Sequence, residues 1–153
     1  MQLLKYKYAF PQVLANIICF CFIFLFVYAA MSKLIDYQKF RVQVGQSPLL
    51  SPFANWVAWF IPLIEIVISA MLAIQKFRNW GLYAAFTLMV LFSAYIFSIT
   101  HYSDYVPCSC GGILEHMNWN QHFVFNLFFV VLAVIGIFSN EYIERYSRTI
   151  INN

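Results

Sequence analysis

Residues 10–31 read FPQVLANIICFCFIFLFVYAAM and contain no charged side chain. A helix rises ~1.5 Å per residue, so a stretch of this length matches the ~30 Å hydrocarbon core of a bilayer. The apolar core of a secretory signal peptide is shorter, ~7–15 residues. We therefore expect residues 10–31 to form an uncleaved transmembrane helix.

Three further stretches are long and apolar enough to span a membrane: residues 52–74, 80–99 and 119–138. The 153-residue chain is 63% hydrophobic and 10% charged, and its mean hydropathy is +0.73, which excludes an ordinary soluble domain. The sequence predicts an all-α integral membrane protein, with residues 1–153 forming a single four-helix transmembrane bundle. Its net charge of +3 comes from scattered basic residues, so we expect no nucleic-acid partner.

The distribution of Lys and Arg predicts which side of the membrane each connection faces. One side would carry Lys5, Lys7, Lys76, Arg78, Arg145 and Arg148, and the other would carry Lys33, Lys39 and Arg41. Because cytoplasmic segments carry the excess of basic residues, we expect both termini to be cytoplasmic. The predicted location is a bacterial inner membrane, with the connection at residues 100–118 on the periplasmic side.

This connection contains residues 107–112, which read PCSCGG. Two residues of extended chain span at most ~7 Å, and a disulfide needs Cα atoms ~4.4–6.8 Å apart, so Cys108 and Cys110 can bridge only through a tight turn. A disulfide in so small a ring should be strained and should exchange readily. In an oxidising compartment, Cys108 and Cys110 are therefore candidate catalytic residues for thiol–disulfide exchange.

Three plainer interpretations of the cysteine pair remain open. A structural disulfide is one, although closing so small a ring removes little entropy from the unfolded chain. A zinc site with His101, His116 and His122 is another, but Cys-x-Cys is shorter than the usual zinc spacing, and we expect no metal. The third is a pair of thiols without a role. Cys19 and Cys21, in the first span, are expected to be packing residues.

Asn118, His122 and Asn126 follow one another at intervals of four residues where the last apolar stretch begins. Such a polar stripe normally faces the interior of a bundle or a wet cavity. A helix N-terminus and a nearby imidazole lower the pKa of a thiol, so we expect His122 to act with the loop cysteines in catalysis. The alternative is that His122 and Asn126 only form hydrogen bonds between helices.

Glu65 lies near the centre of the second apolar stretch, where an uncompensated charge would cost several kcal/mol. We expect it to be protonated at neutral pH, because desolvation disfavours the carboxylate when no cation is within reach. Its candidate hydrogen-bond partners are Asn16, Tyr95 and Asn126. A structural hydrogen bond is the plain interpretation, and the alternatives are a proton relay or contact with a quinone headgroup. The sequence makes no cofactor certain; for a quinone, the candidate binding residues are Glu65 and Asn126.

Three motifs resemble a known family: residues 26–34, FVYAAMSKL, followed by Asp36; residues 62–65, PLIE; and residues 107–111, PCSCG. In these motifs, and over almost its whole length, the chain resembles the DoxX-like superfamily, and within it the MauE branch of redox-associated membrane proteins. The resemblance implies a four-helix bundle that assists disulfide formation in exported proteins, as proposed for MauE in the maturation of methylamine dehydrogenase. The family-like residues are Lys33, Glu65, Cys108 and Cys110.

We therefore expect a membrane thiol–disulfide redox protein that assists disulfide formation or maturation of exported proteins through an outward-facing Cys-x-Cys loop. Besides the lipid bilayer, its expected partner is an exported or periplasmic thiol protein, either thioredoxin-like or the substrate itself. Two alternatives from other classes stay open. One is a non-catalytic membrane assembly subunit, and the other is a small-molecule or ion carrier that uses Glu65.

Overall fold

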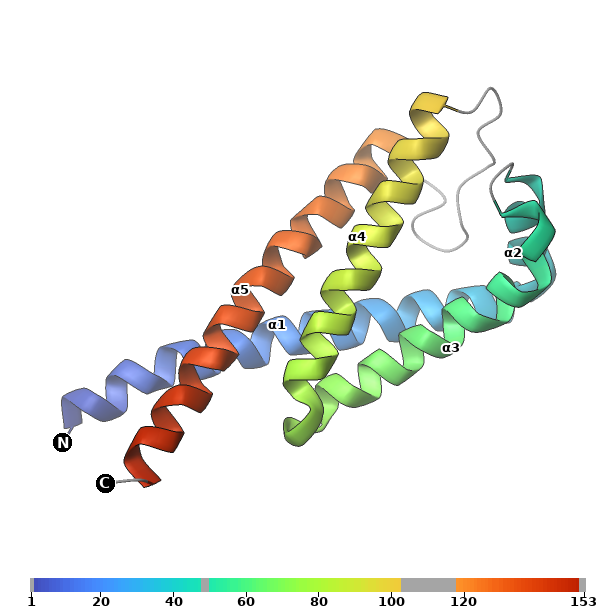
Figure 1. Cartoon of the computed structure of the whole chain (residues 1–153). Coiled ribbons are helices and arrows are strands. Elements are labelled where there is room, and N and C mark those ends of the chain that lie inside the picture. The colour runs from blue at the N-terminus through green and yellow to red at the C-terminus, as the bar shows by residue number, and fades with distance from the viewer. Residues whose placement is uncertain (1, 48–49, 103–117, 152–153) are drawn as a thin grey trace.

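The computed structural model describes residues 2–47, 50–102 and 118–151, and all the regular structure in these ranges is helical. The α-helices and the two single-turn 3₁₀ helices are α1 (Gln2–Ile35), α2 (Tyr37–Gln46), η1 (Ser51–Phe53), α3 (Ala54–Ala73), η2 (Gln75–Phe77), α4 (Arg78–Tyr102) and α5 (Trp119–Ile151). Figure 1 shows their arrangement.

Within the described part of the chain, four helical segments are long and apolar enough to cross a membrane. They are Phe10–Ile35, Ser51–Ala73, Gln75–Tyr102 and Trp119–Arg145. These segments confirm the expected all-α membrane fold with four spanning helices. The cytoplasmic placement of the termini stays a prediction. The short helix α2, between the first and second spans, was not anticipated.

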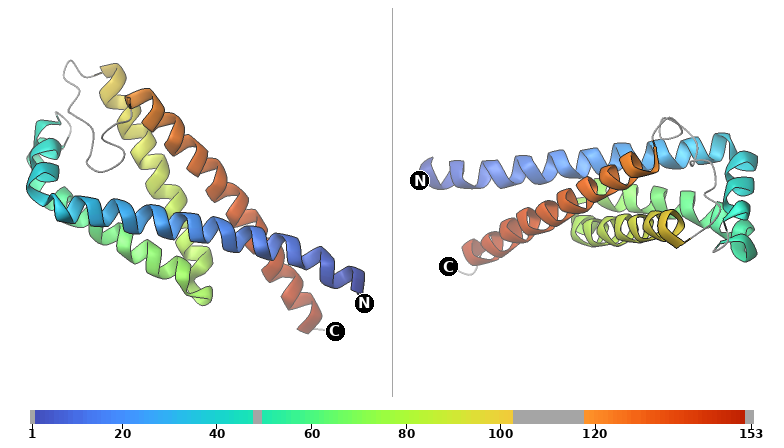
Figure 2. Two further views of the ribbon diagram at one scale, coloured as in Figure 1. Left: turned by 180° about the vertical axis from the view of Figure 1, so that it is seen from behind. Right: turned by 90° about the horizontal axis from the view of Figure 1, so that it is seen from above.

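The four long helices form two pairs. Helix α1 packs along α3, and α4 packs along α5. The two pairs cross, and they spread apart toward the end of the molecule where α2 lies (Figures 1 and 2). The start of α1 and the end of α5 lie together at the opposite end.

Aromatic and aliphatic side chains fill the crossing point. Phe22 of α1 is completely buried, and its ring meets the edge of Phe129 of α5 with the ring centroids 5.3 Å apart. Around this contact lie the other core residues, among them Ile18, Phe26, Ile68, Leu72, Leu82, Met89 and Ala133. Since lipid tails are as apolar as these side chains, it is close packing that holds the helices together here.

Gly136 of α5 lies close to neighbouring helices at this crossing. A Cβ atom added to Gly136 of α5 would lie 3.0 Å from Ile18 Cγ2 and 3.1 Å from Leu82 Cδ2. Because Ile18 is β-branched and stiff, its methyl group has little room to give. Gly136 therefore sets how near α5 comes to α1 and α4.

Polar side chains join the helices at the end that carries the α3–α4 turn. Arg78 donates a hydrogen bond to Asn16 Oδ1 at 2.8 Å, and Tyr83 Oη donates one to Glu141 Oε1 at 2.6 Å. Asn79 adds contacts to Asn140 and Glu144 of α5. These bonds connect α1, α4 and α5 at the end away from the diverging helices.

Exposed aromatic residues gather where α3 begins. Trp56 and Trp59 are 68% and 63% exposed. Trp56 stacks on Phe60 with the ring centroids 5.9 Å apart, and Trp59 lies 5.8 Å from the ring of Tyr37 in α2. Tryptophan and tyrosine favour the boundary between hydrocarbon and headgroups, so this end of α3 has the composition of a membrane interface.

Candidate functional site

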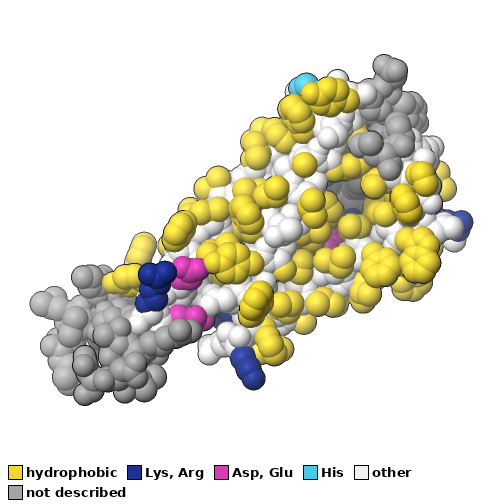
Figure 3. Space-filling model, in the orientation of Figure 1, with side chains coloured by type: hydrophobic (Ala, Val, Ile, Leu, Met, Phe, Trp, Pro, Cys, Tyr) yellow, Lys and Arg dark blue, Asp and Glu magenta, His cyan; other side chains and the backbone are white. Residues whose placement is uncertain are grey.

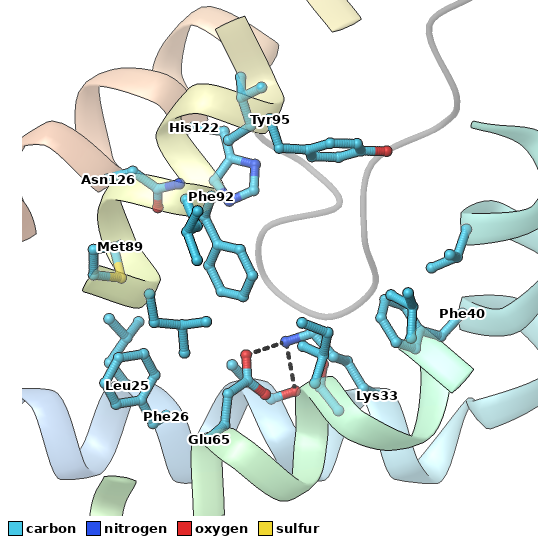
Figure 4. A pocket seen from close by; sticks show the side chains of 18 of the residues that line it. Leu25, Phe26, Lys33, Phe40, Glu65, Met89, Phe92, Tyr95, His122 and Asn126 are labelled. Carbon is cyan, nitrogen blue, oxygen red and sulfur yellow. Dashed lines mark hydrogen bonds and ion pairs between the residues drawn. The ribbon is translucent and has the colours of Figure 1, made fainter. Parts of the chain in front are cut away.

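A cavity of about 300 Å³ lies between the diverging helix pairs. All five α-helices contribute to its lining, which consists mostly of aliphatic and aromatic side chains. Figure 3 shows that this face of the molecule is hollowed between α3 and α4, with hydrophobic side chains around the hollow. Figure 4 shows the polar residues that line the cavity, which come from opposite walls.

An ion pair between α1 and α3 forms one wall. Lys33 Nζ donates to Glu65 Oε1 at 2.7 Å and to the carbonyl oxygen of Ala29 at 3.3 Å. The Glu65 side chain is completely buried, and that of Lys33 is 12% exposed. The ammonium also lies 5.8 Å from the centre of the Phe40 ring, within the range of a cation–π contact.

The expectation that no cation reaches Glu65 is wrong. Lys33 was assigned to the connection after the first span, but α1 continues past residue 31 to Ile35, which places Lys33 on the helix. Its long side chain then reaches along α1 to the carboxylate on α3. The three residues expected to bind Glu65 are not its partners, and Asn16 instead accepts a hydrogen bond from Arg78.

His122 and Asn126 of α5 lie on the opposite wall (Figure 4). They are 9% and 3% exposed. Asn118, the first residue of the predicted stripe, is exposed at the start of α5, where its backbone N–H donates to Gln121 Oε1 at 3.0 Å. The predicted stripe therefore places its two deeper members in the cavity.

Three buried polar atoms of the cavity have no hydrogen-bond partner among the described residues. They are Glu65 Oε2, His122 Nδ1 and Asn126 Nδ2. Buried polar groups are nearly always paired in folded proteins, because each unpaired one loses about 1–3 kcal/mol of hydration. Three such atoms on residues that line one cavity indicate a place where a ligand or water molecules bind.

The other candidate residues are placed as follows. Cys108, Cys110 and His116 lie outside the described residues, so the cysteine chemistry and the zinc alternative stay untested. His101 is exposed near the end of α4, where its ring stacks on Phe97 at a centroid distance of 4.3 Å. No metal-binding group of three or more His, Cys, Asp or Glu occurs in the ranges that the structure describes.

The first-span cysteines occupy the positions expected of packing residues. Cys19 is buried in the core and Cys21 is partly buried beside it, and both are free thiols. Both lie on α1 before Phe22, at the crossing of the helix pairs. They are therefore separate from the cavity, whose α1 lining begins at Leu25.

The fold and the cavity define a class of protein: a four-helix membrane bundle with a buried, internally neutral ion pair facing a largely apolar cavity. The family model described as methylamine utilisation protein MauE matches residues 11–139, and the chain belongs to this family. The expected resemblance to MauE is thereby confirmed, whereas membership of the wider DoxX-like superfamily stays a prediction. Among curated proteins and solved structures, none matches the chain.

Proposed function

We propose that this protein is a membrane thiol–disulfide redox protein that assists the maturation of exported proteins in methylamine utilisation. The observation that carries the proposal is the MauE match over residues 11–139, a range that includes the Cys-x-Cys motif at residues 108–110. Helix α4 ends and α5 begins at the end of the molecule that carries α2 (Figure 1), and residues of α2 and of the first turn of α5 line the cavity. The charge distribution favours an inner-membrane orientation with this end on the periplasmic side.

The proposed reaction is an exchange between two dithiol pairs. A thiolate of the exported protein attacks one sulfur of the Cys108–Cys110 disulfide, and a mixed disulfide forms as the other loop sulfur leaves as a thiolate. A second thiolate of the exported protein then attacks the mixed disulfide and releases the loop sulfur. The exported protein gains a disulfide, and Cys108 and Cys110 gain two electrons and, on protonation, two protons.

Trapping of the mixed disulfide tests this function. A variant with Cys108→Ser or Cys110→Ser keeps one loop thiol and cannot form the loop disulfide. In the reverse exchange, this thiolate attacks a disulfide of the exported protein, and the second loop thiol that would release the mixed disulfide is missing. We expect one of the two variants to accumulate a covalent complex with an exported protein, identified by mass spectrometry after non-reducing electrophoresis. Cys19→Ser with Cys21→Ser is the matched control, and it should behave like the wild type.

The assembly-subunit alternative makes the opposite prediction for the same residues. If the cysteines only shape a loop, a variant with Ser at both positions supports partner maturation at the wild-type level and no mixed disulfide forms. The carrier alternative has less support, because one oxygen of Glu65 is already bound to Lys33. A carrier would fail after Glu65→Gln and would survive the loss of both cysteines.

His122 gives a second prediction about the thiols. It lies in the first turn of α5, near the end of the cysteine-containing connection, and its imidazole would stabilise a thiolate by hydrogen bonding. Loss of this contact raises the thiol pKa, and a change of about one unit corresponds to ~1.4 kcal/mol. His122→Ala should therefore move the midpoint of loop-thiol alkylation by iodoacetamide to higher pH by about one unit.

The control for this measurement is His101→Ala. His101 is the same residue type at the other end of the connection, but its ring is exposed and stacks on Phe97 instead of lining the cavity. We expect it to leave the alkylation midpoint unchanged. An unchanged midpoint in folded His122→Ala as well would assign His122 to packing and remove it from the mechanism.

A further inference from the structure

We propose that the cavity binds the ring of a lipid-soluble quinone, with one ring oxygen toward the Lys33–Glu65 wall and the other toward the His122–Asn126 wall. The inference deepens the proposed function, on which it rests for its biological meaning, by naming the class of electron acceptor. Its binding step involves only described residues and does not require the loop cysteines.

The charge of the cavity selects an uncharged ligand. The positive charge of Lys33 is balanced by Glu65 at 2.7 Å, so the wall presents no net charge. A fatty-acid carboxylate or a lipid phosphate would be a second anion facing the already paired Lys33, the one cation among the described lining residues. A ligand ammonium would be a second cation facing the already paired Glu65, the one carboxylate among the described lining residues. Burying either unpaired charge in a mostly apolar cavity is costly, which favours a neutral molecule.

Each of the two walls combines a hydrogen-bond donor with an acceptor. On the first wall, Lys33 uses two of its three N–H groups on Ala29 and Glu65, and Glu65 Oε2 is without a partner among the described residues. On the second wall, Asn126 Nδ2 is an unpartnered donor, and His122 Nδ1 accepts in one of the two neutral tautomers.

A donor beside an acceptor on each wall suits a molecule with two polar groups that both accept hydrogen bonds in one redox state and both also donate them in the other. A quinone has two carbonyl oxygens that only accept hydrogen bonds. Two electrons and two protons convert it to a hydroquinone, whose two hydroxyl groups also donate. Lys33 and Asn126 can bind the oxidised form at both ends, and Glu65 Oε2 and His122 Nδ1 can bind the reduced form. Each redox state therefore has hydrogen-bonding groups of the matching type on both walls.

The shape of the cavity and its opening also fit a ring with an apolar tail. A volume of about 300 Å³ is at the small end of ligand pockets, enough for one substituted ring. Aromatic side chains of α4 and α5, among them Phe92 and Trp119, provide flat surfaces for such a ring. Leu91 both lines the cavity and is 59% exposed, so the hollow in Figure 3 opens sideways toward lipid between α3 and α4.

Fluorescence titration with decylubiquinone, a quinone with a short alkyl tail, tests the proposal. The protein, in lipid nanodiscs, carries Trp119 as its only tryptophan after Trp56→Phe, Trp59→Phe and Trp80→Phe, all at exposed positions. Trp119 lines the cavity, with its ring centroid 6.3 Å from that of His122. We expect saturable quenching of its fluorescence, and no displacement of the quinone by decylbenzene, which has the ring and tail but no carbonyl groups.

Variants then locate the binding site. Asn126→Leu removes one donor with little change in size, so the dissociation constant should rise about tenfold, the effect of one lost hydrogen bond. Ser93→Ala is the matched control. Ser93 is also a buried polar residue, but its hydroxyl donates to the carbonyl oxygen of Met89 in the same helix, and it does not line the cavity. Its dissociation constant should equal that of the parent protein.

A second pair of variants tests the sideways opening. Leu91→Trp should narrow it and weaken binding, measured by displacement of radiolabelled decylubiquinone. Val90→Trp should not, because the neighbouring Val90 side chain is 39% exposed yet does not line the cavity. Equal affinity in these two variants would contradict entry between α3 and α4.

Other outcomes would overturn the inference. Quenching that rises linearly and equally in all variants would mean that the quinone only partitions into lipid. Saturable binding of dodecanoate in place of the quinone would mean an anion site, and no binding of either would leave a water-filled cavity. A Cys108→Ser, Cys110→Ser double variant should bind decylubiquinone normally while losing thiol exchange, so failure of the binding proposal is distinguishable from failure of the proposed function.

Discussion

Lys33→Met should lower the free energy of unfolding by about 3–5 kcal/mol, the usual effect of removing one partner of a buried ion pair. The reason is the completely buried Glu65 carboxylate, whose Oε1 accepts a hydrogen bond from Lys33 and whose Oε2 has no partner among the described residues. Without the ammonium, a negative charge stays in an apolar environment. Unfolding in detergent micelles, followed by circular dichroism, measures the change.

The double variant Lys33→Met, Glu65→Leu should recover most of this loss. Replacing both members of a buried ion pair by apolar residues of similar size is often neutral or stabilising, because neither charge has to be desolvated. Lys76→Met is the matched control. Lys76 lies 5.8 Å from the Phe77 ring, the same distance as Lys33 from Phe40, but it is exposed. A cation–π contact alone would affect both single variants equally.

A small effect of Lys33→Met would contradict an ionised pair. If it lowers stability by less than about 1 kcal/mol, as for an exposed pair, and Glu65→Gln is equally mild, the carboxyl group is protonated in the folded protein. If Glu65→Gln destabilises the protein and Glu65→Asp restores it, the charge on residue 65 is required. These variants separate the neutral carboxyl expected from the sequence from the ion pair seen in the structure.

Gly136→Leu should destabilise the bundle by about 3 kcal/mol or more, at the upper end of what overpacking a close contact costs. Even a single added Cβ would lie 3.0 Å from Ile18 Cγ2, and a leucine side chain would push α5 away from α1. Thermal unfolding in micelles measures the loss. Partial recovery by Ile18→Ala in the same chain would assign the effect to this contact.

Gly45 in α2 is the control for this substitution. A Cβ added there would have its nearest neighbour at Ala54 Cβ, 3.8 Å away, which is ordinary van der Waals contact. Gly45→Leu should therefore leave stability unchanged or raise it slightly, because glycine in a helix interior is unfavourable by about 0.5–1 kcal/mol. Equal destabilisation by the two variants would show that helix spacing at Gly136 is not critical.

The sequence predicted the four spans well because membrane insertion depends on local composition, which a single stretch of apolar residues carries by itself. It also identified Glu65, His122 and Asn126 as polar residues that need an explanation inside a membrane. The structure places all three around one cavity. Their roles in binding or catalysis remain predictions.

The ion pair was missed because it depends on two facts that are not local. The first is where α1 ends: four residues that looked like the beginning of a loop continue the helix to Ile35. The second is which helices pack together, since Lys33 and Glu65 meet only through the pairing of α1 with α3. The short helix α2 escaped prediction because its composition, YQKFRVQVGQ, has no long apolar run.

The exposed tryptophans at the start of α3 fix how deep the ion pair lies in the membrane. If Trp59 lies at the headgroup boundary, Glu65 is roughly 9 Å further in, at ~1.5 Å per residue along the same helix. That depth is well short of the middle of a ~30 Å hydrocarbon core. Because the tryptophans hold the near boundary at this distance, a change in bilayer thickness moves only the far boundary, and the attraction between Lys33 and Glu65 should be nearly independent of bilayer thickness.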